Sequence, residues 1–188
     1  MTTEQIILKL LLFLAPMYFA NSSAMLLGGK TPIDLGKNFF DGKPIFGKGK
    51  TFRGFFFGIA MGTIASFILL LIFPIETLVF GNYLFLGFLL SLGALIGDLI
   101  ASFFKRRNKI NQGEEILFLD QLDFVIGGMI FGSLIYTPEF YEIIFVGVIT
   151  LIVHKASNFI AYKIKLKKVP WWKRKLFFFQ NFLESFLY

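Results

Sequence analysis

The chain of 188 residues contains no cysteine. Disulfides, thiolate metal sites and a cysteine nucleophile are therefore excluded. Charge is also scarce, because only 16% of the residues are Asp, Glu, Lys or Arg, whereas 56% are hydrophobic. A soluble domain of this size could not bury so much apolar surface, but a lipid bilayer can cover it. The composition predicts an integral membrane protein.

Five apolar stretches are each long enough to cross about 30 Å of hydrocarbon as a helix of about 20 residues. They cover residues 6–27, 54–73, 83–104, 116–136 and 140–162. Because the sequence has no internal repeat and no low-complexity linker, one domain over residues 1–188 is expected. The predicted fold is therefore all-α, a polytopic membrane protein with five transmembrane helices.

The basic residues predict the orientation of these helices. All but one of the 19 Lys and Arg residues lie at 30–53, at 105–109, or from 155 onward, and the exception is Lys9. Positively charged loops stay in the cytoplasm, so these segments are expected there and the N-terminus outside. The net charge of +7 then matches loops that face anionic headgroups, and no nucleic acid partner is expected. The expected location is the cell membrane.

The last residues, 170–188, combine two tryptophans and a basic cluster with a short apolar run. That composition is typical of an interfacial helix, with indole rings at headgroup depth and lysines near lipid phosphates. A solvated basic tail is the alternative. Nothing in the sequence indicates an oligomeric state.

Polar residues in the predicted spans gather near their cytoplasmic ends. They are Asn21, Asp98, Ser102, Asp120, Gln121, Asp123, His154 and Asn158. Ionisable groups in a bilayer are costly unless they are paired or hydrated, so their presence suggests function. A channel would need polar groups at every depth, and the outer halves are almost purely apolar. The pattern predicts a polar cup that opens to the cytosol.

The spacing of these residues indicates which of them share a face. Asp98, Ser102 and Lys105 lie at i, i+4 and i+7, along one stripe of a helix. Asp120 and Asp123 lie at i and i+3, on one face of the next helix. A hairpin of these two helices would bring the three carboxylates together.

Basic residues surround this predicted acidic cluster, namely Lys105, Arg106 and Arg107. Three crowded carboxylates repel one another unless a cation lies among them, and hard oxygen ligands without cysteine favour Mg²⁺. The alternative is that the carboxylates form structural salt bridges with Lys105 and the arginines.

The first cytoplasmic loop is rich in glycine and lysine, and four of its residues are candidates for binding phosphate. They are Lys48, Lys50, Thr51 and Arg53. Glycine lets a backbone approach a phosphate closely, and these side chains supply donors. The segment 47–51 is similar to the end of a P-loop, but the preceding strand and the full spacing are missing. A loop whose lysines only set the topology is the alternative.

Two motifs carry a resemblance to a known family. The first reads Gly97-Asp98-Leu99-x-x-Ser102-x-x-Lys105-Arg106, and the second reads Asp120-Gln121-Leu122-Asp123. Together they resemble the signature of CTP-dependent cytidylyltransferases of membrane lipid synthesis. Gln121 stands where phosphatidate enzymes have Arg, and their Pro-Gly-His-Gly-Gly stretch is absent. Chain length, five spans and the segments 31–34, 47–54 and 119–124 resemble instead the CDP-archaeol synthase family, over nearly the whole chain.

The resemblance implies transfer of CMP from CTP to an isoprenoid ether lipid phosphate, 2,3-bis-O-geranylgeranylglycerol 1-phosphate. The products would be CDP-archaeol and pyrophosphate. It implies that Asp98, Asp120 and Asp123 hold Mg²⁺. The residues implied to bind or neutralise phosphates and nucleotide are Lys48, Lys50, Thr51, Arg53, Ser102, Lys105, Arg106 and Gln121. Asn21, Asp34 and His154 receive no role from it, and His154 could equally be a packed histidine.

Three other functions are weighed. A phosphatidate cytidylyltransferase would use the same chemistry on another lipid. A transporter could use the acidic cluster as a cation site, but the odd number of spans and the missing repeat disfavour it. A CDP-alcohol phosphotransferase is disfavoured because its paired Asp-rich motif is absent.

Overall fold

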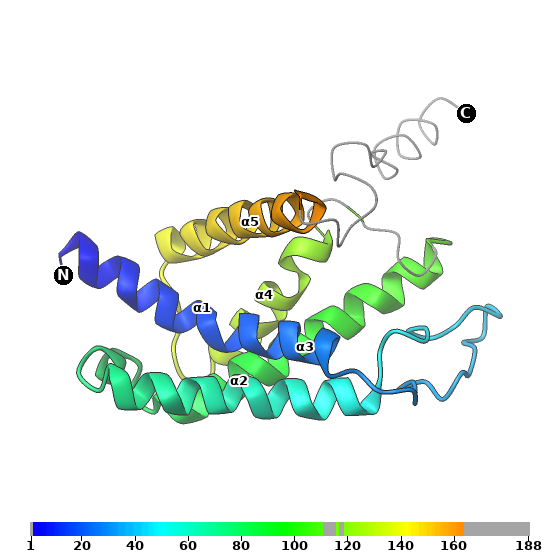
Figure 1. Cartoon of the computed structure of the whole chain (residues 1–188), viewed down its shortest axis with the longest axis horizontal. Coiled ribbons are helices and arrows are strands. Elements are labelled where there is room, and N and C mark those ends of the chain that lie inside the picture. The colour runs from blue at the N-terminus through cyan, green and yellow to red at the C-terminus, as the bar shows by residue number, and fades with distance from the viewer. Residues whose placement is uncertain (1, 111–115, 117–118, 164–188) are drawn as a thin grey trace.

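The computed structural model describes residues 2–110, 116 and 119–163. Its elements, drawn in Figure 1, are α1 (Thr3–Leu26), α2 (Phe52–Ile72), the 3₁₀ helix η1 (Glu76–Phe80), α3 (Tyr83–Arg107), α4 (Leu119–Gly132) and α5 (Phe140–Lys163). The described residues form helices and loops, with two isolated β-bridges in the loop 27–51. The predicted all-α class is thus confirmed, while the predicted interfacial helix at 170–188 lies outside the described residues.

Among the described residues, three helices, α1, α2 and α3, are long and apolar enough to cross a membrane. They match three of the five predicted spans. Helix α4 is shorter than the predicted span 116–136, since its 14 residues extend over about 21 Å. It ends at Gly132, where a turn leads toward Thr137 and Pro138, residues that do not continue a helix. Membrane crossing by α4 and α5 stays a prediction.

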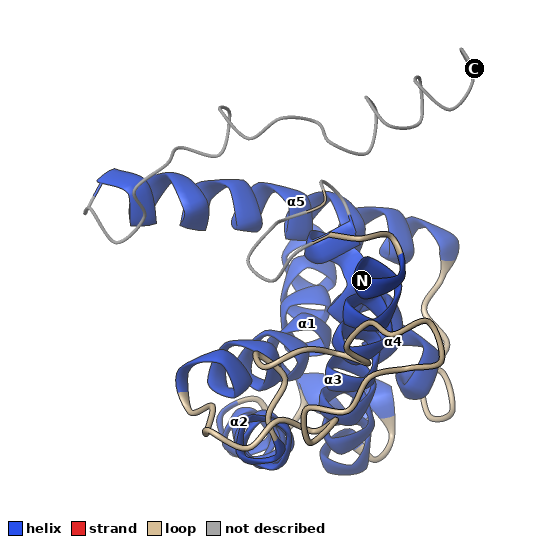
Figure 2. Cartoon of the chain, turned by 90° about the vertical axis from the view of Figure 1, so that its right-hand side faces the viewer, coloured by secondary structure: helices blue, strands red, loops and turns tan. Residues whose placement is uncertain are grey.

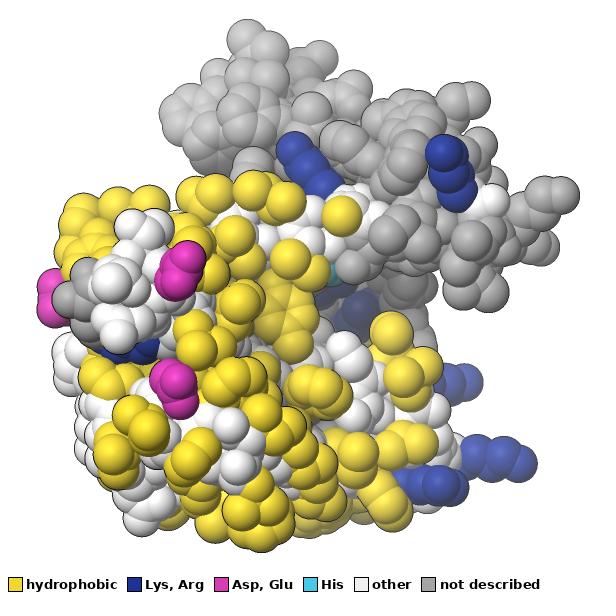
Figure 3. All heavy atoms as spheres, turned by 60° about the vertical axis from the view of Figure 1, so that its left-hand side comes forward, with side chains coloured by type: hydrophobic (Ala, Val, Ile, Leu, Met, Phe, Trp, Pro, Cys, Tyr) yellow, Lys and Arg dark blue, Asp and Glu magenta, His cyan; other side chains and the backbone are white. Residues whose placement is uncertain are grey.

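Successive helices run in alternating directions along the bundle (Figure 1). The loop 27–51 joins α1 to α2 at one end, where α3 also ends and α4 begins, and we call this the basic end. Figure 3 shows a described surface that is largely hydrophobic, with most of the visible Lys and Arg lying away from the acidic side chains of the opposite end. The charge asymmetry inferred from the sequence is therefore present in three dimensions.

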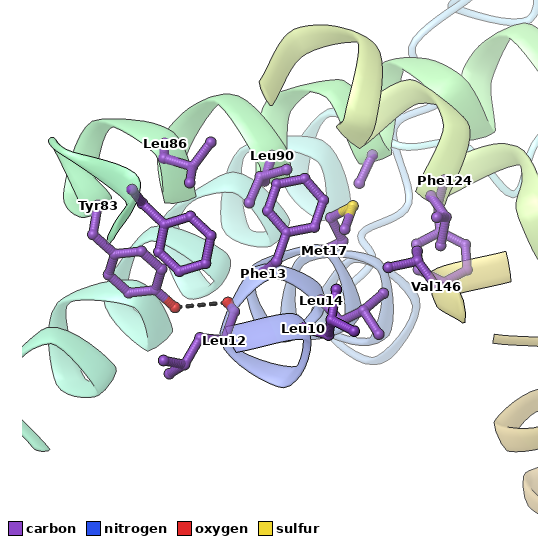
Figure 4. Close-up of a cluster of buried hydrophobic side chains, with 13 residues drawn as sticks. Leu10, Leu12, Phe13, Leu14, Met17, Tyr83, Leu86, Leu90, Phe124 and Val146 are labelled. Carbon is purple, nitrogen blue, oxygen red and sulfur yellow. Dashed lines mark hydrogen bonds between the residues drawn. The ribbon is translucent and has the colours of Figure 1, made fainter. Parts of the chain in front are cut away.

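Helix α1 runs through the core, where Phe13 and Met17 pack against Leu86 and Leu90 of α3 (Figure 4). A proline inside α1, Pro16, has no N–H to donate to the carbonyl of Leu12 four residues earlier. The buried hydroxyl of Tyr83 donates to that carbonyl instead, at 2.7 Å. The bond matters because hydrocarbon offers no water to satisfy an orphaned carbonyl.

Glycines bring α3 and α4 into backbone contact. A Cβ added to Gly97 would lie 2.3 Å from the carbonyl oxygen of Asp123, and one added to Gly127 would lie 2.3 Å from that of Gly93. Gly93 and Gly97 have the four-residue spacing of small residues that is common where membrane helices touch. This contact places Asp98, the next residue of α3, beside the start of α4.

Cysteine labelling tests the predicted orientation, since the chain has no cysteine of its own. Lys37 is exposed in the loop at the basic end, and Asn82 is exposed at the opposite end. We expect Lys37→Cys to react with a membrane-impermeant maleimide from the cytosolic side alone, and Asn82→Cys from the outside alone. Labelling of both positions from the same side would contradict the topology.

Candidate active site at the basic end

Asp34 organises the loop between α1 and α2. Its buried carboxylate accepts hydrogen bonds from the backbone N–H groups of Gly36 (2.9 Å), Phe46 (3.0 Å) and Gly47 (2.8 Å). Burial by itself would raise the pKa of Asp34, but these backbone donors outweigh it and lower the pKa below the ordinary value. The carboxylate is thus ionised at neutral pH and ties the two halves of the loop together.

Removing this carboxylate should loosen the loop without unfolding the helices. We expect Asp34→Ala to speed trypsin cleavage after the exposed residues Lys37 and Lys48, because three backbone donors lose their acceptor and the loop loosens, at a local cost of about 1–3 kcal/mol. Mass spectrometry of the fragments measures the cleavage, and Glu76→Ala, which removes an exposed carboxylate at the opposite end, is the control.

The same carboxylate predicts a pH dependence. A lowered pKa means that the stabilisation by Asp34 is fully present above the ordinary Asp pKa and is lost as the pH falls through the lower, folded value. Cleavage of the unsubstituted loop by pepsin, a protease that is active in acid, should therefore stay low down to that acidic range. Equal cleavage of Asp34→Ala and the unsubstituted protein at neutral pH would show that Asp34 does not hold the loop.

Arg107, at the end of α3, fastens the loop to the bundle. Its Nε lies 2.9 Å from a carboxylate oxygen of Asp41, and its guanidinium lies over the rings of Phe39 and Phe103, 5.0 and 4.7 Å from their centroids. In return, the Lys43 ammonium donates to the carbonyl oxygen of Arg107 at 2.7 Å. Figure 2 shows the loop running across the helix ends at this side of the molecule.

In the docked loop, the side chain of Lys50 contacts that of Asp98. The Lys50 ammonium donates to both carboxylate oxygens of Asp98, at 2.6 Å for Oδ1, and both side chains are half-buried. The backbone of Asp123 of α4 lies against Gly97, the residue before Asp98. The glycine permits this contact, since no side chain separates the backbones of α3 and α4 there. A predicted phosphate ligand and two predicted metal ligands therefore share one site.

A second ion pair joins Lys105 of α3 to Asp120 of α4, with 2.7 Å between Nζ and Oδ2. Asp120 also accepts the backbone N–H of Ile116 at 2.9 Å, just before α4 begins. Among the residues that the structure describes, no three acidic or histidine side chains are grouped closely enough to hold a metal ion. Asp98 and Asp120 are each paired with a lysine, although the partner of Asp98 comes from the first loop and not from the arginines.

The remaining loop candidates have different surroundings. Thr51 is buried at the N-cap of α2, where its Oγ1 accepts from the N–H groups of Gly54 and Gly29, both at 3.1 Å. Its first role is thus to close the loop onto α2. Lys48 is exposed, and so is Arg53, whose guanidinium lies 5.5 Å from the ring centre of Phe57.

The other predicted residues lie along α3, α4 and their neighbours. Ser102 is buried on α3, and Arg106 donates from Nη1 to the carbonyl oxygen of Ile110 at 2.6 Å. The Nε of Arg106 is buried with no hydrogen-bond partner. Gln121 is half-buried in the first turn of α4, and Asn21 and His154 are half-buried on α1 and α5. The structure gives no separate role to Asn21 or His154.

Sequence reasoning missed three parts of this arrangement. The loop-organising role of Asp34 depends on turn geometry that no motif encodes. The sequence showed Arg107 only as one of several neighbouring basic residues, and it did not show that Arg107 holds the loop against α3. The four-residue spacing of Gly93 and Gly97 does indicate a close contact between helices. Its consequence for Asp98 could not be predicted, because the sequence does not show which residues of α4 lie against Gly97.

Comparisons with known proteins agree with one another. Residues 3–171 match a family model described as CarS-like, CDP-archaeol synthase. A CDP-archaeol synthase of Pyrococcus abyssi is 46% identical over 165 residues, which cover 85% of this chain and 95% of the relative. The CDP-archaeol synthase of Methanocaldococcus jannaschii is 44% identical over 167 residues, with 85% and 94% covered. A solved structure, described as an intramembrane enzyme for archaeal membrane lipids biosynthesis, is 32% identical with a TM-score of 0.75 and covers 81% of this chain and 94% of that one.

Proposed function

Because the chain belongs to the CDP-archaeol synthase family, we propose that the charged cluster at its basic end binds CTP together with the phosphate of an isoprenoid lipid. The chain is a membrane enzyme of the cytidylyltransferase type, and it synthesises CDP-archaeol. The transporter considered on composition alone is thereby ruled out as the main function.

The contact between Lys50 and Asp98 carries the proposal. It joins a loop rich in phosphate-binding residue types to a carboxylate that lies 48 positions further along the chain. Both Lys50 and Lys105 hold an ammonium against a carboxylate in a half-buried setting. A triphosphate carries more negative charge than one carboxylate, so an incoming CTP draws both ammonium groups toward its phosphates.

In the proposed reaction, an oxygen of the lipid phosphate attacks the α-phosphorus of CTP in line. A new P–O bond forms as the bond between the α-phosphorus and the bridging oxygen of the β-phosphate breaks, and pyrophosphate leaves. The attacking phosphate is already ionised at neutral pH, so no general base is needed. The protein contributes by positioning both phosphates and neutralising their charge. In this proposal Lys50 and Lys105 do so, together with Lys48 of the loop, Arg53 in the first turn of α2 and Arg106 in the last turn of α3.

A divalent cation fits these residues by the chemistry of their donors. Asp98, Asp120 and Asp123 offer hard carboxylate oxygens, which suit Mg²⁺, and the ammonium of Lys50 already sits against both oxygens of Asp98. We propose that these three carboxylates hold Mg²⁺ once Lys50 and Lys105 have turned to phosphate. When bound, the ion would supply charge neutralisation at the transferred phosphoryl group.

The proposed substrates enter from different phases. CTP is a cytosolic solute, so the basic end is assigned to the cytosol, in line with its lysines and arginines. The lipid phosphate stays in the bilayer, with its headgroup at the depth of the basic end. The proposed lipid is 2,3-bis-O-geranylgeranylglycerol 1-phosphate, whose chains would lie along the apolar helix surfaces.

Product analysis tests this function directly. Protein reconstituted in liposomes is given CTP and Mg²⁺ with either the geranylgeranyl ether lipid phosphate or phosphatidic acid, and the products are identified by mass spectrometry. We expect the CDP-lipid of the ether substrate and an equimolar amount of pyrophosphate, both abolished by EDTA. Faster turnover of phosphatidic acid would assign the other lipid class, and the absence of any CDP-lipid would overturn the proposed reaction.

A further inference from the structure

The three consecutive basic residues at the end of α3 have different surroundings. Lys105 forms an ion pair with Asp120 of α4, and Arg106 donates to a backbone carbonyl just beyond the end of the helix. Arg107 instead faces the loop 27–51, which lies at the same end of the bundle (Figure 1). The three residues therefore need not share one role.

The guanidinium of Arg107 contacts the tip of the loop, residues 38–44, in three ways. Its Nε forms the 2.9 Å ion pair with Asp41, its Nη2 donates to the carbonyl oxygens of Lys43 and Pro44, and its plane lies over the rings of two phenylalanines. The Nε and Nη1 atoms are buried, and the side chain as a whole is 18% exposed. The donors of this guanidinium are thus directed at the loop or enclosed, and they are not presented to a phosphate in solution.

The tip is connected to Lys50 by hydrogen bonds between the two arms of the loop. Backbone N–H groups donate across the arms in three pairs, from Phe39 to Lys43 (2.8 Å), from Ile45 to Lys37 (3.3 Å) and from Ile33 to Lys50 (2.8 Å). Between these pairs, the carboxylate of Asp34 accepts from two N–H groups of the opposite arm. The loop is paired from its tip to its base, so it is expected to move as one body.

The contact also acts on the end of α3. The ammonium of Lys43 donates at 2.7 Å to the carbonyl oxygen of Arg107, and carbonyls in the last turn of a helix lack partners within the helix. Lys105 and Arg106 belong to that same turn. The contacts of Arg107 with the tip, together with this return bond, therefore join the two segments that carry the proposed phosphate ligands.

We propose that Arg107 is a positioning residue for CTP. It holds the loop tip against α3 and so keeps Lys50 at the spacing from Lys105 that a triphosphate needs, without touching the nucleotide. When the tip is released, the apparent affinity for CTP falls with the fraction of molecules whose loop is docked. Saturating CTP draws the loop back, so the maximal rate is kept. This role in CTP binding rests on the proposed function, whereas the docking of the loop does not.

Steady-state kinetics in liposomes test the role. We expect Arg107→Met to raise the KM for CTP roughly tenfold, with kcat within about twofold and the KM for the lipid nearly unchanged. Arg107→Lys keeps the charge but loses the planar fork that reaches several acceptors, so it should restore the KM for CTP in part. Lys109→Met is the matched control, because it removes an exposed charge two residues further on, and it should leave these constants unchanged.

Asp41→Asn separates positioning from direct binding by the sign of its effect. The amide keeps an oxygen that can accept the Lys43 N–H, a bond of 3.1 Å, but loses the charge that faces Arg107. If Arg107 positions the loop, the KM for CTP rises, and the double variant with Arg107→Met is no worse than Arg107→Met alone. If Arg107 bound a phosphate of CTP, loss of the competing carboxylate would free its guanidinium and the KM would fall.

A distance measurement follows the loop without reference to activity. Cysteines that replace Lys37 in the loop and Phe85 of α3, both exposed, carry spin labels, and electron–electron double resonance gives their separation in liposomes. We expect a broader distribution in Arg107→Met and in Asp41→Asn, which narrows again when CTP is added. The distribution in Lys109→Met should match that of the unsubstituted protein.

A second label pair, at the exposed residues Ile68 of α2 and Ile100 of α3, reports on the helices alone. A broadened distribution of this pair in Arg107→Met would overturn the positioning role, because the bundle itself would have changed. Unchanged loop distances in Arg107→Met, an unchanged KM for CTP despite broadened distances, or a lower KM in Asp41→Asn would also overturn it. If the unsubstituted protein made no CDP-lipid, the proposed reaction and this role in it would fail together, and the distances would still decide whether Arg107 docks the loop.

Discussion

Asp98→Asn is expected to abolish CDP-archaeol synthesis while the protein still inserts and folds. The amide keeps the volume and one acceptor oxygen of the carboxylate but loses the charge that pairs with Lys50 and would bind a cation. Losing several kcal/mol of charge stabilisation corresponds to a rate decrease of at least about a hundredfold. The rate is measured at saturating CTP, lipid and Mg²⁺, with folding checked by size-exclusion chromatography in detergent.

Two further variants make that result specific. Glu76→Gln makes the same chemical change at the opposite end of the bundle and should leave the rate unchanged. Lys50→Gln should mainly raise the KM for CTP, because its ammonium is assigned to the phosphates. Removing the charge of a metal ligand should cost several kcal/mol of transition-state stabilisation. Activity of Asp98→Asn above about a tenth of the normal rate would therefore contradict a metal-binding role for Asp98. If Asp98→Asn had the same kcat and KM as Lys50→Gln, the only role of the Asp98 carboxylate would be its ion pair with Lys50.

Gly97→Val should be strongly damaging to the fold. A Cβ at this position would lie 2.3 Å from the Asp123 carbonyl oxygen and 3.0 Å from the Cα of Gly127, and backbone atoms cannot turn aside as a flexible side chain can. Helices α3 and α4 must then separate, which also moves Asp98 away from Asp123. We expect loss of the monodisperse peak in size-exclusion chromatography and loss of activity. Overpacking alone typically costs about 1–3 kcal/mol.

Gly147→Val is the matched control for this prediction. It makes the same change in α5, where an added Cβ would meet nothing within 4 Å. The thermal unfolding temperature in detergent should therefore stay close to that of the unsubstituted protein. Equal unfolding temperatures for Gly97→Val and Gly147→Val would show that the backbone contact between α3 and α4 is not needed.

Local patterns in the sequence predicted much of the helical architecture. The predicted start at 83 coincides with that of α3, and the start at 140 coincides with that of α5. Apolar length determines such boundaries when lipid is the surrounding medium. Helix α4 ends before the predicted span does, because hydropathy continues to 136 whereas the backbone turns after Gly132. A window of apolar residues does not register where the backbone turns.

The sequence identified most residues of the candidate site, but it did not predict which of them form ion pairs with one another. Helical spacing correctly set Lys105 on the side of α3 that meets Asp120, because three- and four-residue rules act within one element and its hairpin partner. The partner of Asp98 could not be predicted in this way. Lys50 reaches it only after Asp34 and Arg107 have folded and docked the loop, which depends on contacts far apart in the sequence. The ion pair between Lys9 and Glu142 could not be predicted for the same reason, since the two residues lie far apart in the sequence.

Pro16 and Tyr83 constrain the order in which the sequence can diverge. As long as a proline stands at 16, the carbonyl of Leu12 depends on the Tyr83 hydroxyl, and a change to phenylalanine would strand that carbonyl in hydrocarbon. Once another residue at 16 supplies its own N–H, the hydroxyl at 83 is free to disappear. A lineage can therefore lose the proline first and the tyrosine afterwards, while the reverse order passes through a less stable intermediate with an unsatisfied carbonyl.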